Sequence, residues 1–411
     1  YSPFLKDGRI FVLTEENAPN GRLIELAHDG SELRTVVPEQ NGAIRQVALI
    51  RNRLFINYLD NLIPSVRQWN LTGEDLGELD VPTDGTIQLA VQPDGESLFY
   101  TYESFTTPTV TFEYSLEAAS SQLWHRRFTP TPTAPHSIEH VSFSSKDGTL
   151  IPMTLISVPP QNPGLSRPAV MTGYGGFGVS MTPQFSVLAT ILTRLGAVFA
   201  LPNIRGGGDF GRQWHDAGRG LNRQTAYEDF IAGAEWLCEV GLTSPQQLAI
   251  FGGSNSGLLV GVVMTQRPNL FRAVLCIAPL LDMVRYERFN RTLKWREEFG
   301  TVDDEESFQA LYAYSPYHHV DTSVGYPAAL FVSGDQDDRC DPMHSRKMTA
   351  RLQENPAQNY PILLDYSAER GHSPVLPMSV RVEALTNRLA FIFRELKILS
   401  VPGEFHEASR S

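Results

Sequence analysis

The sequence predicts an α/β protein in two parts. An all-β segment over residues 1–130 precedes an α/β domain over residues 131–411 that has a doubly wound, mostly parallel sheet. In the first part, short runs of β-branched and aromatic residues are separated by turn signals. In the second part, apolar runs of strand length alternate with segments of helix length, which is typical of a parallel sheet covered by helices on both faces. The proline-rich stretch Pro130–Pro135 separates the two patterns.

The first part carries strand-like runs but no clear amphipathic helix. Turn signals such as Asn20-Gly21, Asp29-Gly30 and Thr72-Gly73 lie between these runs. The Asp-Gly signals recur at intervals of about forty residues, which fits the blades of a β-propeller. A β-sandwich or an irregular sheet fits the same periodicity. The expected strands are Arg9–Thr14, Arg22–Ala27, Arg45–Leu49, Arg53–Tyr58, Thr86–Val91 and Ser97–Tyr102.

The second part contains the elements of a parallel sheet. Helices are expected at residues 226–240, 257–266 and 380–396. In an open sheet of this kind, ligands bind outside the carboxyl ends of the strands, so we expect the active site there. The expected strands are Ala169–Thr172, Ala197–Ala200, Leu248–Phe251, Val274–Ile277 and Ala328–Val332.

Two serines, Ser254 and Ser256, lie on the turn between the strand that ends at Phe251 and the helix that follows. A nucleophile on such a strand-to-helix turn sits in strained backbone, and the residues two before and two after it must be small. Around Ser254 these flanking residues are Gly252 and Ser256, whereas around Ser256 one of them is Leu258. We therefore expect Ser254 to be the nucleophile and Ser256 to be a packing residue bonded to backbone.

A serine nucleophile needs a base, and the base needs a carboxylate to orient it. In hydrolases with this kind of sheet the chain order is serine, acid, histidine. Downstream of Ser254, the strand that ends at Ser333 is followed by a loop with Asp335, Asp337 and Asp338, and the next strand is followed by His372. His372 is the expected base. Position alone does not choose among the three aspartates.

The composition argues against several classes of function. The formal net charge of −12 comes without a lysine or arginine tract, which argues against a nucleic-acid surface. The sequence contains no run of about 18 apolar residues, so it predicts no membrane-spanning helix. The three widely spaced cysteines suggest neither disulfides nor a metal site but reduced thiols. We expect a cytoplasmic monomer without metal or cofactor, and, because the chain begins with Tyr1, either a processed chain or a fragment.

Six motifs in order resemble those of the prolyl oligopeptidase family of serine peptidases, in its proline-specific branch. They are Gly173-Tyr-Gly-Gly-Phe177, Asn203-Ile-Arg-Gly-Gly-Gly208, Trp214-His215, Gly252-Gly-Ser-Asn255, Asp337-Asp-Arg339 and Gly371-His372. The resemblance implies an α/β-hydrolase domain joined to a β-propeller. It also implies that Asp337 orients His372, and that the Tyr174 hydroxyl and the backbone N–H of Asn255 bind the oxyanion.

The same resemblance implies the substrate-binding residues. Trp295 would stack on the proline ring of the substrate, and Phe177, Leu280 and Phe299 would complete an apolar pocket. Arg339 would donate a hydrogen bond to a carbonyl group of the bound peptide. Cys340 replaces an aliphatic residue that is common after this arginine, so we predict that a bulky thiol reagent inhibits the enzyme.

Two departures from the family pattern keep alternatives open. Glu297 and Glu298 lie beside the pocket, and in the related oligopeptidase B acidic residues in this neighbourhood accept Arg or Lys. Residues 1–130 also suffice for only about three blades of roughly 45 residues, which suggests an N-terminally truncated chain. The expected function is hydrolysis of short peptides after proline through an acyl-enzyme. The alternatives are cleavage after Arg or Lys, transfer of the acyl group to an amine, and an inactive fragment that binds peptides.

Overall fold

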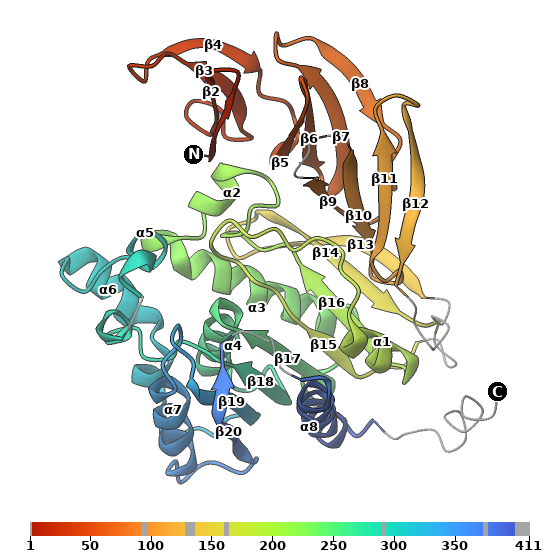
Figure 1. Cartoon of the computed structure of the whole chain (residues 1–411). Coiled ribbons are helices and arrows are strands. Elements are labelled where there is room, and N and C mark those ends of the chain that lie inside the picture. Colours follow the sequence, from red (N-terminus) through yellow and green to blue (C-terminus); the bar gives the residue numbers. More distant parts are fainter. Residues whose placement is uncertain are drawn as a thin grey trace. The chain divides into compact units, whose positions relative to one another are not determined.

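The computed structural model describes residues 2–92, 95, 97–127, 136–159, 164–289, 292–372 and 377–398 (Figure 1). The proline-rich stretch at 130–135 lies outside the described residues. The chain divides into two compact units. Residues 1–133 form the first together with 180–186 and 208–215, and residues 134–179, 187–207 and 216–411 form the second. These units do not test the domain boundary at residue 130, which stays a prediction.

The described part of the first unit contains three four-stranded antiparallel sheets, each formed by strands that are consecutive in the chain. The turns carry residues that the tight geometry requires. Gly73 has φ of 95°, and a Cβ there would lie 2.6 Å from the carbonyl oxygen of Val36. The sheets comprise β1 (Ser2–Lys6), β2 (Arg9–Thr14), β3 (Arg22–Leu26) and β4 (Glu32–Val37); β5 (Ala43–Ile50), β6 (Arg53–Asp60), β7 (Ile63–Asn70) and β8 (Asp75–Leu79); and β9 (Thr86–Val91), β10 (Leu98–Glu103), β11 (Val110–Ser115) and β12 (Ser120–Arg126).

The middle sheet of the first unit is buried on both faces, as strand β6 shows. Successive strand residues point to opposite faces. Leu54 and Ile56 belong to a core cluster with Phe11 of the first sheet. Phe55, between them, belongs to a second cluster with Tyr114 of the third sheet. The three sheets therefore stack face to face, as propeller blades do, and the continuous apolar run of β6 follows from burial on both sides.

The second unit is built on one eight-stranded sheet with the order β13-β14-β16-β15-β17-β18-β19-β20. Strands β13 and β14 pair antiparallel, and so do β14 and β16, whereas the remaining pairs are parallel. The sheet is therefore mixed and mostly parallel. Its strands are β13 (Ser137–Ser144), β14 (Leu150–Ser157), β15 (Ala169–Met171), β16 (Val198–Pro202), β17 (Leu248–Gly253), β18 (Ala273–Ile277), β19 (Ala328–Gln336) and β20 (Ile362–Gly371).

Helices connect the parallel strands. Helix α1 (Val187–Arg194) connects β15 to β16, and helix α4 (Asn255–Gln266) connects β17 to β18. These two connections run in opposite directions along the sheet. Because such crossovers are right-handed, the two helices lie on opposite faces of the sheet. Helix α2 (Arg212–Asp216) lies mostly in the first unit. The helices of the second unit are α1 (Val187–Arg194), α3 (Arg223–Glu239), α4 (Asn255–Gln266), α5 (Arg296–Phe299), α6 (Glu305–Tyr314), α7 (Met343–Gln353) and α8 (Met378–Leu396).

Candidate active site

The turn between β17 and α4 presents Ser254. This residue has φ of 59° and ψ of −121°, a region that non-glycine residues rarely occupy and that costs on the order of 1–3 kcal/mol. The turn is held by a hydrogen bond of 2.9 Å from the Ser254 N–H to the carbonyl oxygen of Ile277. A Cβ on Gly252 would collide with the carbonyl oxygen of Ser256. The small flanking residues are therefore a steric requirement of this strained turn.

Ser256 has a different role from Ser254. Its side chain is buried, and its hydroxyl donates a hydrogen bond to the carbonyl oxygen of Gly173. This contact ties the start of α4 to the segment that carries Tyr174. Ser256 therefore lies where a packing residue is expected.

The structure brings Ser254, His372 and Asp337 into one hydrogen-bonded chain. Nε2 of His372 lies 3.1 Å from Oγ of Ser254. Nδ1 of His372 lies 2.8 Å from Oδ2 and 3.0 Å from Oδ1 of Asp337. A carboxylate at Nδ1 accepts a hydrogen bond from the N–H of that nitrogen, so Nε2 carries no proton and can accept one, which is the state that a general base requires.

Burial and hydrogen bonds distinguish Asp337 from its two neighbours. Asp337 is 4 % exposed, and its Oδ1 also accepts hydrogen bonds from the backbone N–H groups of Arg339 at 3.0 Å and Cys340 at 2.8 Å. Asp335 is exposed and pairs with Arg346 at 2.7 Å, and Asp338 is exposed. Asp337 is thus fixed by two backbone donors at a distance suitable for orienting His372.

Tyr174 and Asn255 are joined through the Asn255 side chain, whose Nδ2 donates to the carbonyl oxygen of Tyr174 at 2.7 Å. Asn255 is the first residue of α4, and backbone N–H groups at the start of a helix have no partner within the helix. Burial raises the pKa of the Tyr174 phenol, so this hydroxyl keeps its proton and can donate. Both groups therefore have the chemistry of oxyanion donors.

Three of the predicted pocket residues form an aromatic cluster. The ring centroids of Phe177 and Phe299 are 5.5 Å apart, those of Phe177 and Trp295 are 6.1 Å apart, and those of Trp295 and Phe299 are 6.3 Å apart. All three pairs meet edge to face. Phe299 is buried, whereas Trp295 is only half-buried. Phe299 therefore lies at the buried side of the cluster, whereas the ring of Trp295 is accessible to a substrate.

The remaining predicted binding residues lie on loops at the carboxyl ends of strands. Leu280 is buried in the loop that follows β18. Arg339 lies in the loop that follows β19, and its side chain is exposed. Cys340 is 1 % exposed, and burial raises its pKa strongly. Because the thiolate is the reactive form, these properties disfavour the predicted alkylation of Cys340.

Sequence reasoning missed a buried ion pair beside these residues. Nη1 of Arg223, at the start of α3, lies 2.7 Å from Oε1 of Glu298, at the end of α5. The same Glu298 oxygen accepts a hydrogen bond of 2.7 Å from the backbone N–H of Phe177. The sequence places Glu298 beside the predicted pocket, which could have indicated a buried charge there. Its partner Arg223, however, lies 75 residues away in the sequence.

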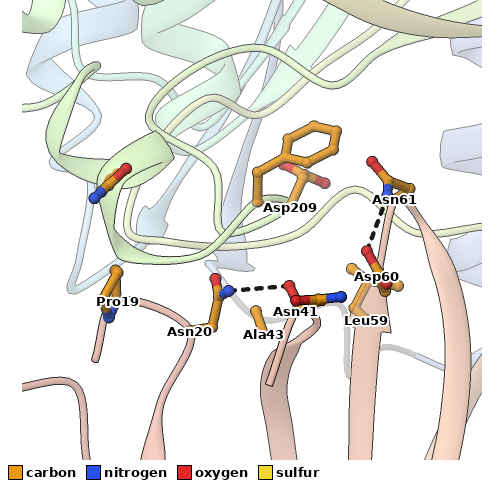
Figure 2. A pocket seen from close by; sticks show the side chains of 10 residues that line it. Pro19, Asn20, Asn41, Ala43, Leu59, Asp60, Asn61 and Asp209 are labelled. Carbon is orange, nitrogen blue, oxygen red and sulfur yellow. Dashed lines mark hydrogen bonds between the residues drawn. The ribbon is translucent and has the colours of Figure 1, made fainter. Parts of the chain in front are cut away.

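The first unit contains a separate pocket of about 310 Å³, shown in Figure 2. Polar residues line much of it, among them Asn20, Asn41 and Asp60, and Nδ2 of Asn20 donates to the carbonyl oxygen of Asn41 at 2.9 Å. None of the predicted site residues contributes to this pocket. Across the residues that the structure describes, no group of three or more His, Cys, Asp or Glu side chains is placed to hold a metal ion. No helix in the same described ranges is long and apolar enough to cross a bilayer.

Comparison with known families identifies both parts of the chain. Residues 4–127 match the model of the prolyl oligopeptidase N-terminal β-propeller domain, and residues 183–398 match the model of the prolyl oligopeptidase family. The chain belongs to the prolyl oligopeptidase family. The predicted fold class, a partial β-propeller segment followed by an α/β-hydrolase domain, is thereby confirmed.

Individual relatives agree with this assignment. The chain is 32 % identical over 394 residues to a prolyl endopeptidase of Elizabethkingia miricola. This match covers 95 % of this chain and 56 % of the relative. A solved structure from an analysis of two prolyl endopeptidases is 37 % identical, with a TM-score of 0.93, and the match covers 97 % of this chain and 60 % of that one.

A third similar structure contains a bound peptide. Prolyl oligopeptidase B from Galerina marginata, bound to a 25-residue macrocyclization substrate, is 28 % identical with a TM-score of 0.89 over 96 % of this chain and 57 % of that one. The chain therefore spans little more than half the length of the relatives that it matches.

Proposed function

We propose that this chain is a serine endopeptidase that cleaves short peptides on the carboxyl side of proline through an acyl-enzyme. The observation that carries the proposal is the hydrogen-bonded series from Ser254 through His372 to Asp337. Family membership supports a peptidase, and the relatives named prolyl endopeptidase support the choice of proline. No metal or cofactor is part of the mechanism.

In the first half-reaction, Oγ of Ser254 attacks the carbonyl carbon of the proline residue while its proton moves to Nε2 of His372. The carbonyl oxygen becomes an oxyanion that accepts hydrogen bonds from the Tyr174 hydroxyl and the Asn255 N–H. Removing one such donor typically lowers kcat about 100- to 1000-fold. The negative charge of Asp337 stabilises the imidazolium ion that forms.

Acylation is complete when His372 gives its proton to the amine and the C–N bond breaks, which leaves the peptide acyl group on Ser254. A water molecule then attacks the ester carbon and transfers a proton to Nε2. Collapse of this second tetrahedral intermediate breaks the ester C–O bond, returns the proton from Nε2 to Oγ of Ser254, and releases a carboxylic acid, which ionises in solution. If an amine attacks the ester in place of water, the same acyl-enzyme gives transacylation, which stays an alternative.

The pocket residues favour proline over a basic side chain. Trp295 offers a half-buried indole ring for stacking, and such aromatic contacts contribute about 0.5–1.5 kcal/mol beyond burial. Glu298 is 4 % exposed and paired with Arg223, so its charge is already compensated and does not favour Arg or Lys in the substrate. Leu280 and Arg339 complete the proposed site as an apolar wall and a donor to a substrate carbonyl group.

The test is reaction with a fluorophosphonate probe, followed by turnover of chromogenic peptides that end in Pro or Arg. We expect labelling of the chain and of the matched control Ser256→Ala, no labelling of Ser254→Ala, and faster cleavage after Pro. Faster cleavage after Arg would favour the oligopeptidase B alternative. Failure to label, together with measurable binding of a proline-containing peptide, would favour an inactive binding fragment. The cytoplasmic location and the monomeric state stay predictions.

A further inference from the structure

The ion pair between Arg223 and Glu298 is almost fully buried, with exposed fractions of 1 % and 4 %. Burying two charges costs hydration free energy that their mutual attraction only partly restores, and an apolar pair of the same volume is often as stable. Stability alone therefore does not account for an arginine at this position. Its other contacts point to a role in the active site.

Arg223 contacts both parts of the proposed site. Its Nη2 donates to Oδ1 of Asn255, whose Nδ2 in turn donates to the carbonyl oxygen of Tyr174. On the pocket side, its Cζ lies 5.1 Å from the ring centroid of Phe299. Through Glu298, the same guanidinium is connected to the backbone N–H of Phe177.

Gly176 shows how closely the segment between Tyr174 and Phe177 packs on this network. A Cβ at Gly176 would lie 2.6 Å from Nδ2 of Asn255 and 2.8 Å from Nη1 of Arg223. Both distances are too short for any side chain. The glycine therefore lets the backbone of this segment approach the arginine and the asparagine directly.

We propose that Arg223 is a positioning residue that holds the oxyanion-binding Asn255 and the Phe177 side of the proline pocket in one rigid arrangement; this inference rests on the proposed function. The planar guanidinium has five donors in a fixed fork, so it can bind Glu298 and Asn255 together. A lysine keeps the charge but is a compact point charge without that fork. Arg223→Lys therefore removes the fork of donors but keeps the positive charge, and so tests which of the two is needed.

The primary measurement is kcat for a prolyl peptide, per active site titrated with the fluorophosphonate. For Arg223→Lys we expect kcat to fall about 10- to 100-fold, since a displacement of about 1 Å in an active site can cost that much. The matched control is Arg272→Lys, which alters another arginine–glutamate pair of 2.7 Å, formed with Glu395, and should leave kcat per titrated site unchanged. A purely structural role would lower the number of titratable sites but not the turnover of each.

The second variant, Asn255→Ala, removes the link to Arg223 and, with it, the hydrogen bond from Asn255 to the Tyr174 carbonyl oxygen, but it keeps the buried ion pair. It can therefore be measured even if Arg223→Lys does not fold. We expect Asn255→Ala to lower kcat about tenfold or more, and the double variant to be no slower than the slower single variant, because both changes break one connection. Additive effects, or kcat within about twofold of the wild type for Arg223→Lys, would overturn the inference.

Hydrogen exchange at the side-chain amide of Asn255 distinguishes failure of this inference from failure of the proposed function. This readout does not depend on activity. If the wild type neither labels nor turns over peptide, the proposed function fails, and the exchange rates still decide the role of Arg223. Protection in the wild type that is lost in Arg223→Lys supports the inference, whereas equal exchange in both contradicts it.

Discussion

Replacing Asp337 by Asn tests how the carboxylate controls His372. In the structure Oδ1 accepts the backbone N–H groups of Arg339 and Cys340, and Oδ2 is the closer oxygen to Nδ1 of His372. An asparagine would keep its carbonyl oxygen at the two backbone donors and turn its NH₂ group toward His372. Nδ1 would then have to accept a hydrogen bond, which places the ring proton on Nε2 and leaves no base for Ser254.

The expected loss follows from this change of tautomer. A triad with the wrong tautomer loses about 10⁴-fold in kcat, which corresponds to about 5.5 kcal/mol of transition-state stabilisation. The assay is turnover of a prolyl peptide at neutral pH, together with a thermal melt to show that the variant is folded. Asp335→Asn is the matched control, because this exposed neighbour pairs with Arg346 instead. Turnover of Asp337→Asn within about tenfold of the wild type, or an equal loss in the control, would refute the tautomer argument.

Three further predictions concern the oxyanion site, the propeller core and a buried histidine. Tyr174→Phe should lower kcat about 100- to 1000-fold. Because burial raises the pKa of Tyr174, its ionisation should not reduce wild-type activity below about pH 10; a loss of kcat at pH 9 that disappears in Tyr174→Phe would contradict this. Phe55→Ala should destabilise the first unit by about 3–5 kcal/mol in urea unfolding, since Phe55 is fully buried and packs edge to face on Tyr114. The exposed Leu5→Ala should change the same free energy by less than about 0.5 kcal/mol, and equal effects would rule out the core described here. His344 is buried, its Nδ1 accepts from the N–H groups of Leu281 and Asp282, and burial lowers its pKa to about 4. The unfolded chain therefore binds this proton more readily, and His344 should cost about 2 kcal/mol of stability as the pH falls from 7 to 5; His344→Gln should show a correspondingly smaller pH dependence, and an unchanged one would contradict the assignment.

Sequence alone favours Ser254 over Ser256 as the nucleophile because the steric constraint is local. The steric demand for small residues around a strained turn distinguishes Ser254 from Ser256 within residues 252–258, and the collision at Gly252 is the physical cause of that demand. The choice of Asp337 is different. It depends on burial, on the pairing of Asp335 with Arg346, and on the contact of Asp337 with His372, which lies 35 residues along the chain. The residues alone therefore left three aspartates, and the family resemblance selected Asp337.

Two of the strands that were not predicted lack the patterns on which prediction depends. Strand β8 is an edge strand whose residues are exposed except for Leu79, so it needs no apolar alternation. Strand β7 contains Pro64, which ordinarily argues against a strand. Arg223 was overlooked for another reason. Its role arises from contacts with residues 32 and 75 positions away, and no local pattern in α3 records them.

We propose that Oγ of Ser254 is the attacking nucleophile of this chain and that His372 activates it. The most direct measurement is mass spectrometry of proteolytic fragments after reaction with the fluorophosphonate. We expect a single phosphonyl adduct, carried by Ser254, that does not form in His372→Ala under the same conditions. An adduct on Ser256 or on any other residue, or peptide hydrolysis that continues while Ser254 stays unmodified, would contradict it.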